Sequence, residues 1–252
     1  MSEETEQKLL RQIEALQRDI KELKGSDEKV IPTYSFSKIK FSDLKKFIKI
    51  EQNFIDETIF NEWFSYEKNI STDEVVFLKQ LIEKNRKFIN LYHEEDLKIN
   101  FIAPLISKID YFLIPQNIRN YYNEKLTYKT EKFILNGETD FVISKGLVGS
   151  ERPYFFIQEF KKGFENSNPE PQLLAELISA VELNNELSMK GAYIIGERWN
   201  FVILEKLGKD KYQYFVSRTF NCTNIEDLKG IYKNLMFIKN EIITRIKEEN
   251  EL

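Results

Sequence analysis

The chain has 252 residues, of which 42% are apolar and 31% are charged, and its formal net charge is −4 at pH 7. This length and apolar content predict one substantial core rather than two full domains. The modest negative charge excludes a protein that coats nucleic acid nonspecifically, but it allows an acidic catalytic site that a cation neutralises. Cys222 is the only cysteine, which excludes a disulfide within the chain and a cysteine metal site.

The sequence also limits the location of the protein and its possible chemistry. All apolar runs are far shorter than the roughly 20 residues that cross a membrane. The opening residues, MSEETEQKLL, are acidic and polar and do not resemble a signal peptide, so we expect a cytoplasmic protein. His93 is the only histidine, which excludes a histidine-based triad and a multi-histidine zinc site.

Residues 1–24 predict a coiled-coil-like helix. Apolar side chains recur at alternating steps of four and three residues, at Leu9, Ile13, Leu16, Ile20 and Leu23. A homodimer would cover this seam, and packing on the chain's own domain is the alternative. Gly25 breaks the pattern, so residues 25–38 are expected to form a linker.

The next interval, residues 39–91, is expected to be helical. Apolar residues follow helical spacing in 41–64, and 71–74 has the form of a capping box before a helix that runs to about Leu91.

Three longer helices are expected over residues 94–109, 171–185 and 225–249, because each carries an apolar stripe at helical spacing. The first should pack on a sheet and bring its N-terminal end to the working edge of that sheet. In the second, Gln172 is expected on the polar face.

From residue 125 onward the hydrophobic pattern changes to period two, which predicts strands. Asn136-Gly137 is a strong hairpin signal and is expected at a turn. Further strands are expected over residues 154–161, 191–196 and 199–204, and an edge strand over residues 212–217.

Three residues of these strands suggest chemistry. Glu159 and Lys161 are two apart, so their side chains project from one face, and Asp140 on the neighbouring strand can add a second carboxylate. The acids can hold a hard divalent cation, and the ammonium group can orient water or stabilise charge on a phosphate. Most acid-x-lysine triplets are solvated, but the apolar run 154–157 favours a buried strand here. The pattern therefore predicts phosphodiester hydrolysis.

The order of elements and residues resembles the PD-(D/E)XK phosphodiesterase superfamily. It is most similar to the nuclease domain of type I restriction enzyme motor subunits and to related stand-alone proteins. The resemblance covers about residues 92–206 and rests on YHEEDLKINFIAPLI from Tyr92, GETDFVI from Gly137, FIQEFKK from Phe156, PQLLAEL from Pro171 and GAYIIGERWNFVIL from Gly191. Thr139 stands where the superfamily name has proline.

The resemblance implies an α/β, restriction-endonuclease-like fold with a central mixed sheet flanked by helices. The nuclease-like core would occupy residues 92–220, followed by a C-terminal helix over residues 221–252. The expected ligands of Mg²⁺ or Mn²⁺ are Asp140, Glu159, the carbonyl of Phe160 and Glu94. Lys161 would polarise the attacking water, and Gln172 would contact a phosphate or a water molecule. Glu95 remains an alternative to Glu94.

The sequence thus predicts a metal-dependent endonuclease that acts on DNA in restriction or defence. A catalytically silent module that binds nucleic acid or a partner protein in the same cleft is the alternative. The basic residues expected to line the cleft are Lys125, Lys129, Lys132, Lys145, Arg152, Lys162 and Arg198.

Overall fold

The computed structural model describes residues 31–56, 58–163 and 168–251, together with Gln12, Ala15, Leu16 and Asp19. Two compact units divide the chain, Met1–Pro32 and Thr33–Leu252. The four separately described residues of the first unit are helical. Apart from Leu16, the predicted coiled-coil seam lies outside the described residues.

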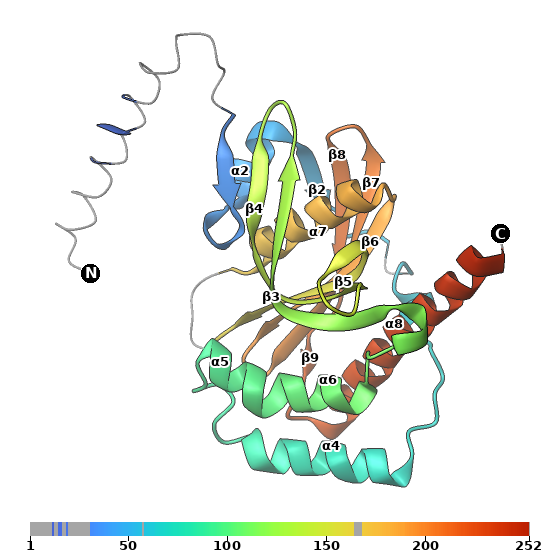
Figure 1. Cartoon of the computed structure of the whole chain (residues 1–252). Coiled ribbons are helices and arrows are strands. Elements are labelled where there is room, and N and C mark those ends of the chain that lie inside the picture. Colours follow the sequence, from blue (N-terminus) through green and yellow to red (C-terminus); the bar gives the residue numbers. More distant parts are fainter. Residues whose placement is uncertain are drawn as a thin grey trace. The chain divides into compact units, whose positions relative to one another are not determined.

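The second unit is built on a curled, mixed sheet of nine strands (Figure 1). The strands are β1 (Thr33–Ser35), β2 (Lys49–Gln52), β3 (Ile118–Lys129), β4 (Ile134–Lys145), β5 (Glu151–Lys161), β6 (Ser188–Ile195), β7 (Arg198–Gly208), β8 (Lys211–Val216) and β9 (Phe220–Asn221). Their order is β1-β4-β5-β6-β7-β8-β2, with β3 paired to β4 and β9 paired to β7. The pairs β1–β4, β5–β6 and β2–β8 are parallel, and the others are antiparallel.

Helices pack on both faces of this sheet and create two apolar cores. One face carries the 3₁₀ turn η1 (Phe36–Lys38), α2 (Phe41–Phe47) and α7 (Glu170–Asn184). The other carries α3 (Asn61–Phe64), α4 (Thr72–Asn85), α5 (Glu94–Leu97), the π-helical turn η2 (Lys98–Ile102), α6 (Ala103–Ile109) and α8 (Ile225–Glu251). A further 3₁₀ turn, η3 (Ile114–Gln116), precedes β3. Within the described residues, no helix has the length and apolar character to cross a membrane.

β5 contributes side chains to both cores, as a strand buried on both faces requires. Phe156 belongs to the core under α6 and α8, and Ile157 belongs to the core under α7. The expected strand at residues 154–161 is therefore central, with β4 on one side and β6 on the other.

The predicted helix over residues 94–109 is confirmed as the succession of α5, η2 and α6. Its expected stripe is buried, and it consists of Leu97, Phe101, Ile102, Leu105 and Ile106. The capping box before α4 is also confirmed, because the Ser71 hydroxyl accepts from the Glu74 N–H and the Glu74 carboxylate accepts from the Ser71 N–H.

The predicted turn at Asn136-Gly137 is wrong. Both residues lie inside β4, where Gly137 is opposite Leu126. The turn between the two strands instead spans residues 130–133. The Thr130 hydroxyl closes it by accepting a hydrogen bond from the Phe133 N–H at 2.9 Å. Gly137 serves packing instead, since a Cβ there would lie 2.7 Å from the Phe36 ring.

Two other expectations change at the far side of the sheet. The interval 39–91 contains β2 in addition to its helices, because Ile48 and Ile50 are buried at a spacing of two. The predicted edge strand at residues 212–217 corresponds to β8, but β2 pairs along it in parallel. The edge of the sheet is therefore β2, which comes from a distant part of the sequence.

Candidate functional site

Asp140 and Glu159 meet where β4 parts from β5. Phe141 and Gln158 form the last bridged pair, and Asp140 and Glu159 take the next position on each strand. Opposite residues of an antiparallel pair project from the same face, so the two carboxyl groups lie together. Beyond this point the edge of β4 pairs with β1, at 134–136.

The β3–β4 hairpin is irregular at the same place. Its bridged pairs stop at Tyr122–Phe141 and resume at Glu124–Thr139. Between them, Asn123 adopts a left-handed conformation with φ 55°. The buried Lys98 donates to Asn123 Oδ1 at 3.0 Å. Lys98 thus anchors the irregularity directly opposite Asp140.

The backbone of Phe160 also faces Asp140. Its N–H donates to Asp140 Oδ2 at 2.7 Å. In a strand, the carbonyl of a residue points to the same edge as its N–H, so the Phe160 carbonyl is directed toward β4 as well. The next carbonyl, that of Lys161, points the other way and accepts from the Gly196 N–H at 3.0 Å.

Lys161 joins the acids of β5 and α5. Its Nζ lies 2.6 Å from Glu159 Oε1 and 3.5 Å from Glu94 Oε1. Burial lowers the pKa of Lys161, but the charge of Glu159 and the hydrogen bond to it prevail and raise that pKa above its usual value. Glu95 instead pairs with Lys98, at 2.6 Å. Of the two candidate glutamates, the structure therefore brings Glu94 to the lysine.

Glu159 is completely buried. Burial raises its pKa well above the usual carboxyl value, and the neighbouring charge of Asp140 raises it further, while Lys161 opposes both effects. Glu159 Oε1 accepts from Lys161, but Oε2 is buried without a hydrogen-bond partner. One carboxyl oxygen at the centre of the site is thus unsatisfied.

Gln172 is not on a polar face, as the sequence predicted, but is buried. The prediction fails because α7 packs against the sheet on one side and against η1 and α2 on the other. Its Nε2 donates to Glu176 Oε1 at 3.2 Å, one helical turn further along. The structure therefore places Gln172 at the same end of β5 as Glu159.

Glu176 is a site residue that the sequence reasoning missed. It is completely buried, and burial raises its pKa well above the usual value, followed by the charges of Glu159 and Asp140. Its Oε2 is also buried without a partner. The available signal was an acid flanked directly by the apolar residues Ala175 and Leu177, one turn after Gln172.

The site offers oxygen donors rather than a preformed metal cage. Among the described residues, no three histidine, cysteine or acidic side chains are arranged to hold a metal ion. Lys161 occupies Glu159 Oε1 and a backbone N–H occupies Asp140 Oδ2. The remaining carboxyl oxygens of Asp140 and Glu159, together with the Phe160 carbonyl, are the donor types that fit a hard cation such as Mg²⁺.

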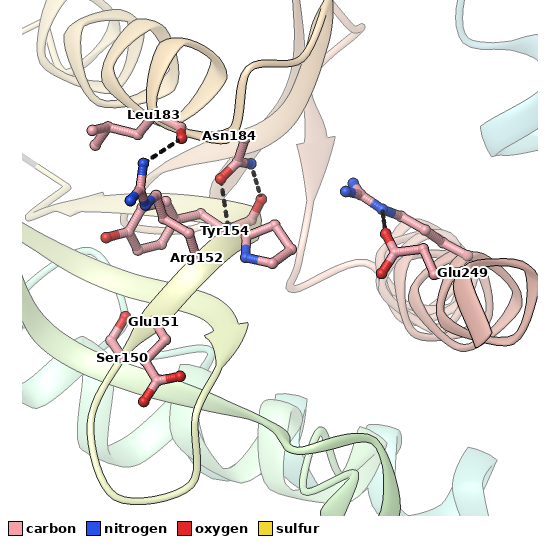
Figure 2. Close-up of a pocket in the computed structure, with 9 residues that line it drawn as sticks. Ser150, Glu151, Arg152, Tyr154, Leu183, Asn184 and Glu249 are labelled. Atoms are coloured by element: carbon pink, nitrogen blue, oxygen red, sulfur yellow. Dashed lines mark hydrogen bonds and ion pairs between the residues drawn. The ribbon is translucent and has the colours of Figure 1, made fainter. Parts of the chain in front are cut away.

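A large cavity lies elsewhere, at the start of β5 (Figure 2). Its volume is about 670 Å³, and β5, α7 and α8 contribute its lining. Tyr154 in its wall is seven residues before Lys161, or roughly 23 Å along an extended strand. Arg152, expected in a DNA cleft, lines this cavity and donates to the Leu183 carbonyl at 3.0 Å. This cavity is therefore separate from the acidic site.

No known family model matches the chain, and no curated protein sequence matches it. Any assignment of function rests on the arrangement of the chain's own residues. The fold and the site define an α/β protein in which carboxyl groups from β4, β5 and α7 gather around one lysine at the end of a central strand.

Proposed function

We propose that the protein is a metal-dependent phosphodiesterase that cleaves DNA, with a restriction-endonuclease-like core of the PD-(D/E)XK type. One observation carries this proposal. Burial and the charge of Asp140 raise the pKa values of Glu159 and Glu176 beside Lys161, and each of these two glutamates has a buried oxygen that no donor contacts. Burying several carboxyl groups side by side costs stability, and such groups with raised pKa values are typical of sites that bind a cation or catalyse a reaction.

Asp140, Glu159 and the carbonyl of Phe160 are the groups that would hold Mg²⁺ or Mn²⁺, with Glu94 in support. When bound, the cation would polarise a phosphate oxygen and lower the pKa of a coordinated water molecule. The Phe160 N–H fixes the Asp140 carboxylate by a hydrogen bond of 2.7 Å. This contact orients Asp140 before any ligand arrives.

Lys161 would act through its retained positive charge. Its raised pKa keeps the ammonium group protonated at neutral pH, so it serves as a donor and not as a base. The group can hold the attacking water by a hydrogen bond and stabilise the negative charge that develops on the phosphate. Glu94 and Glu159 bracket the ammonium group and limit its position.

Gln172 would contribute an amide to the phosphate or to a water molecule. Its side chain is held by Glu176 and is buried beside the acids, so it cannot swing freely into solvent. Glu176 therefore positions the Gln172 amide through this hydrogen bond. This role would account for an acid that is completely buried in α7.

The proposal also includes the substrate, the location in the cell and the oligomeric state. DNA is the expected substrate, and the cytoplasm is the expected location. The helix of residues 1–24 is expected to form a coiled coil that joins two copies of the chain. With two sites in one assembly, both strands of a duplex could be cut.

A silent binding module is the second candidate, and one contact favours it. In the 2.6 Å ion pair between Lys161 and Glu159, the two charged groups of the site neutralise each other. In this candidate the lysine permanently neutralises the acid, and the cleft binds nucleic acid without cleaving it.

DNA cleavage separates the two candidates. Purified protein is incubated with plasmid, linear duplex and single-stranded DNA in the presence of Mg²⁺, Mn²⁺ or EDTA. We expect cleavage with either cation, none in EDTA, and none by Asp140→Asn. Glu83→Gln on the exposed face of α4 is the matched control and should cleave like the wild type. DNA binding without cleavage under every condition would favour the silent module.

A further inference from the structure

Among the described residues, no strand pairs with the outer edge of β2. It is the last strand in the order, and β8 is the neighbour that the described part of the chain gives it. The Lys49 N–H donates to the Asp210 carbonyl and the Asn53 N–H donates to the Tyr214 carbonyl, both at 2.8 Å. Backbone groups of alternate residues point to opposite edges of a strand, so odd-numbered residues face β8.

The even-numbered residues Ile50 and Gln52 therefore direct their N–H and C=O groups away from the sheet. Ile48 is extended as well, with φ −132° and ψ 157°, and its own N–H is used by the Leu44 carbonyl at the end of α2. Its carbonyl is the next outward acceptor. An edge of this kind is a template for an incoming strand.

The side chains of β2 are complementary to themselves. Lys49 and Glu51 are exposed and lie on one face, with Lys49 Nζ 3.6 Å from Glu51 Oε1. A lysine alone would guard the edge against pairing, because two copies would bring like charges together. An acid two residues after the lysine reverses that effect when a second copy runs antiparallel.

Exposed apolar side chains also lie close to β2. Phe54 and Ile55, shortly after β2, are 78% and 93% exposed, and Leu207 on β7 is 48% exposed. All three line one groove beside β2, together with Lys49 and Glu51. Exposed apolar groups gathered beside an open strand indicate a contact surface rather than scattered surface residues.

We propose that β2 pairs with β2 of a second copy of this chain, antiparallel and centred on Ile50. Ile50 and its copy would exchange both of their backbone hydrogen bonds, and the Gln52 N–H would reach the carbonyl of Ile48 in the other copy. In this register Lys49 of each copy lies opposite Glu51 of the other, at a position where side chains approach closely. The sheet then continues through a twofold axis from one molecule into the next.

The second copy is favoured over an unrelated extended peptide by this charge pattern. A twofold axis at Ile50 satisfies both lysines and both glutamates at once, with no charge left over. A foreign strand would need the same alternation to do so. The inference is independent of catalysis, because none of these residues belongs to the acidic site.

Charge reversal in the full-length protein tests the register. Lys49→Glu alone would place four acids together, and Glu51→Lys alone would place four lysines together. We expect each variant to weaken dimerisation roughly tenfold, since two opposed pairs change from attraction to repulsion. The double variant Lys49→Glu/Glu51→Lys should restore the dimer, measured as a dissociation constant by sedimentation equilibrium.

Mixing the two single variants gives a sharper result. A pair formed by one copy of each brings Glu opposite Lys at both positions, so the mixture should form heterodimers although neither variant dimerises well alone. Both variants keep a net negative charge, so general attraction does not explain this. Lys79→Glu and Glu83→Lys, exposed on α4, are the matched controls and should leave dimerisation unchanged, alone or mixed.

Three outcomes would overturn the proposal. The first is a wild-type chain that stays monomeric at hundreds of micromolar. The second is a dimer whose dissociation constant does not respond to either reversal, which would assign the contact to another surface such as the N-terminal helix. The third is a mixture of the two variants that associates no better than each variant alone.

Discussion

The two ends of β5 carry polar clusters of opposite character. At the Tyr154 end, the Asn184 amide accepts from the Tyr154 N–H at 2.9 Å and donates to its carbonyl at 2.7 Å (Figure 2). At the Lys161 end, Glu159 Oε2 and Glu176 Oε2 are buried without hydrogen-bond partners. The first end lines the cavity of about 670 Å³, yet the polar groups of Tyr154 and Asn184 there are paired with each other.

The candidate site is therefore distinguished by buried carboxyl groups with raised pKa values, and not by the size of a cavity. Paired groups at the Tyr154 end hold α7 to β5, which is a structural task. At the other end, α7 presents Gln172 and Glu176 to the acids of β5. Burying carboxyl groups there lowers stability, and proteins retain such costs where a ligand or a reaction uses them.

The largest effect is expected for Lys161→Met. This change keeps the length of the side chain and removes the charge that would stabilise the transition state, so cleavage should fall by about 100-fold or more. Glu159 can become protonated in the variant, so the fold should survive. Cleavage rates under single-turnover conditions, with circular dichroism to confirm folding, measure the outcome. Cleavage at the wild-type rate would contradict the assigned role of Lys161.

Asn184→Ala is the matched change at the other end of β5. It removes two hydrogen bonds to Tyr154 and should lower the free energy of unfolding by about 1 to 3 kcal/mol. Cleavage by the folded variant should stay at the wild-type rate. If this variant lost cleavage while remaining folded, the two ends of β5 would not be separable in function.

A smaller effect, of opposite sign, is expected for Glu176→Gln. The folded-state pKa of Glu176 is raised, so the folded protein binds more protons than the unfolded chain, and stability is lost as pH rises from about 4.5 through the folded pKa. Glutamine carries no charge, so the variant should be more stable than the wild type at pH 8, by about 1.4 kcal/mol for each unit that separates the two pKa values of Glu176. The difference should shrink toward pH 4.5.

Urea unfolding of both proteins from pH 4.5 to pH 8 provides the comparison. The difference between the two curves isolates Glu176, because all other titrating groups are shared. A variant that is less stable than the wild type at pH 8 would show that the Glu176 carboxylate is satisfied in the folded protein. In that case the contrast between the ends of β5 would weaken.

The elements with strong periodicity could be predicted from the sequence. Apolar spacing indicates directly which side chains are buried. It therefore predicted the buried face of α5, η2 and α6 and the buried strand before Glu159. The same logic brought Asp140, Glu159 and Lys161 to adjacent strands. In the structure they are adjacent, and Glu94 joins them.

The features that the sequence did not predict correctly depend on residues from distant parts of the chain. Gln172 looked solvated because helical spacing cannot reveal that α2 and η1 cover the second side of α7. Asn136-Gly137 looked like a turn because the dipeptide is a local signal, whereas Phe36 sets the need for glycine there. The irregularity at Asn123 follows from Lys98 on another element and leaves no local pattern.

The most direct measurement of the central claim is calorimetric titration of the full-length protein with Mn²⁺ and Mg²⁺. We expect a binding heat for the wild type and for Asn184→Ala, and binding at least tenfold weaker for Asp140→Asn, because Asp140 would be a direct ligand. Equal binding by Asp140→Asn, or no cation binding by the wild type, would contradict a metal site at the Lys161 end of β5.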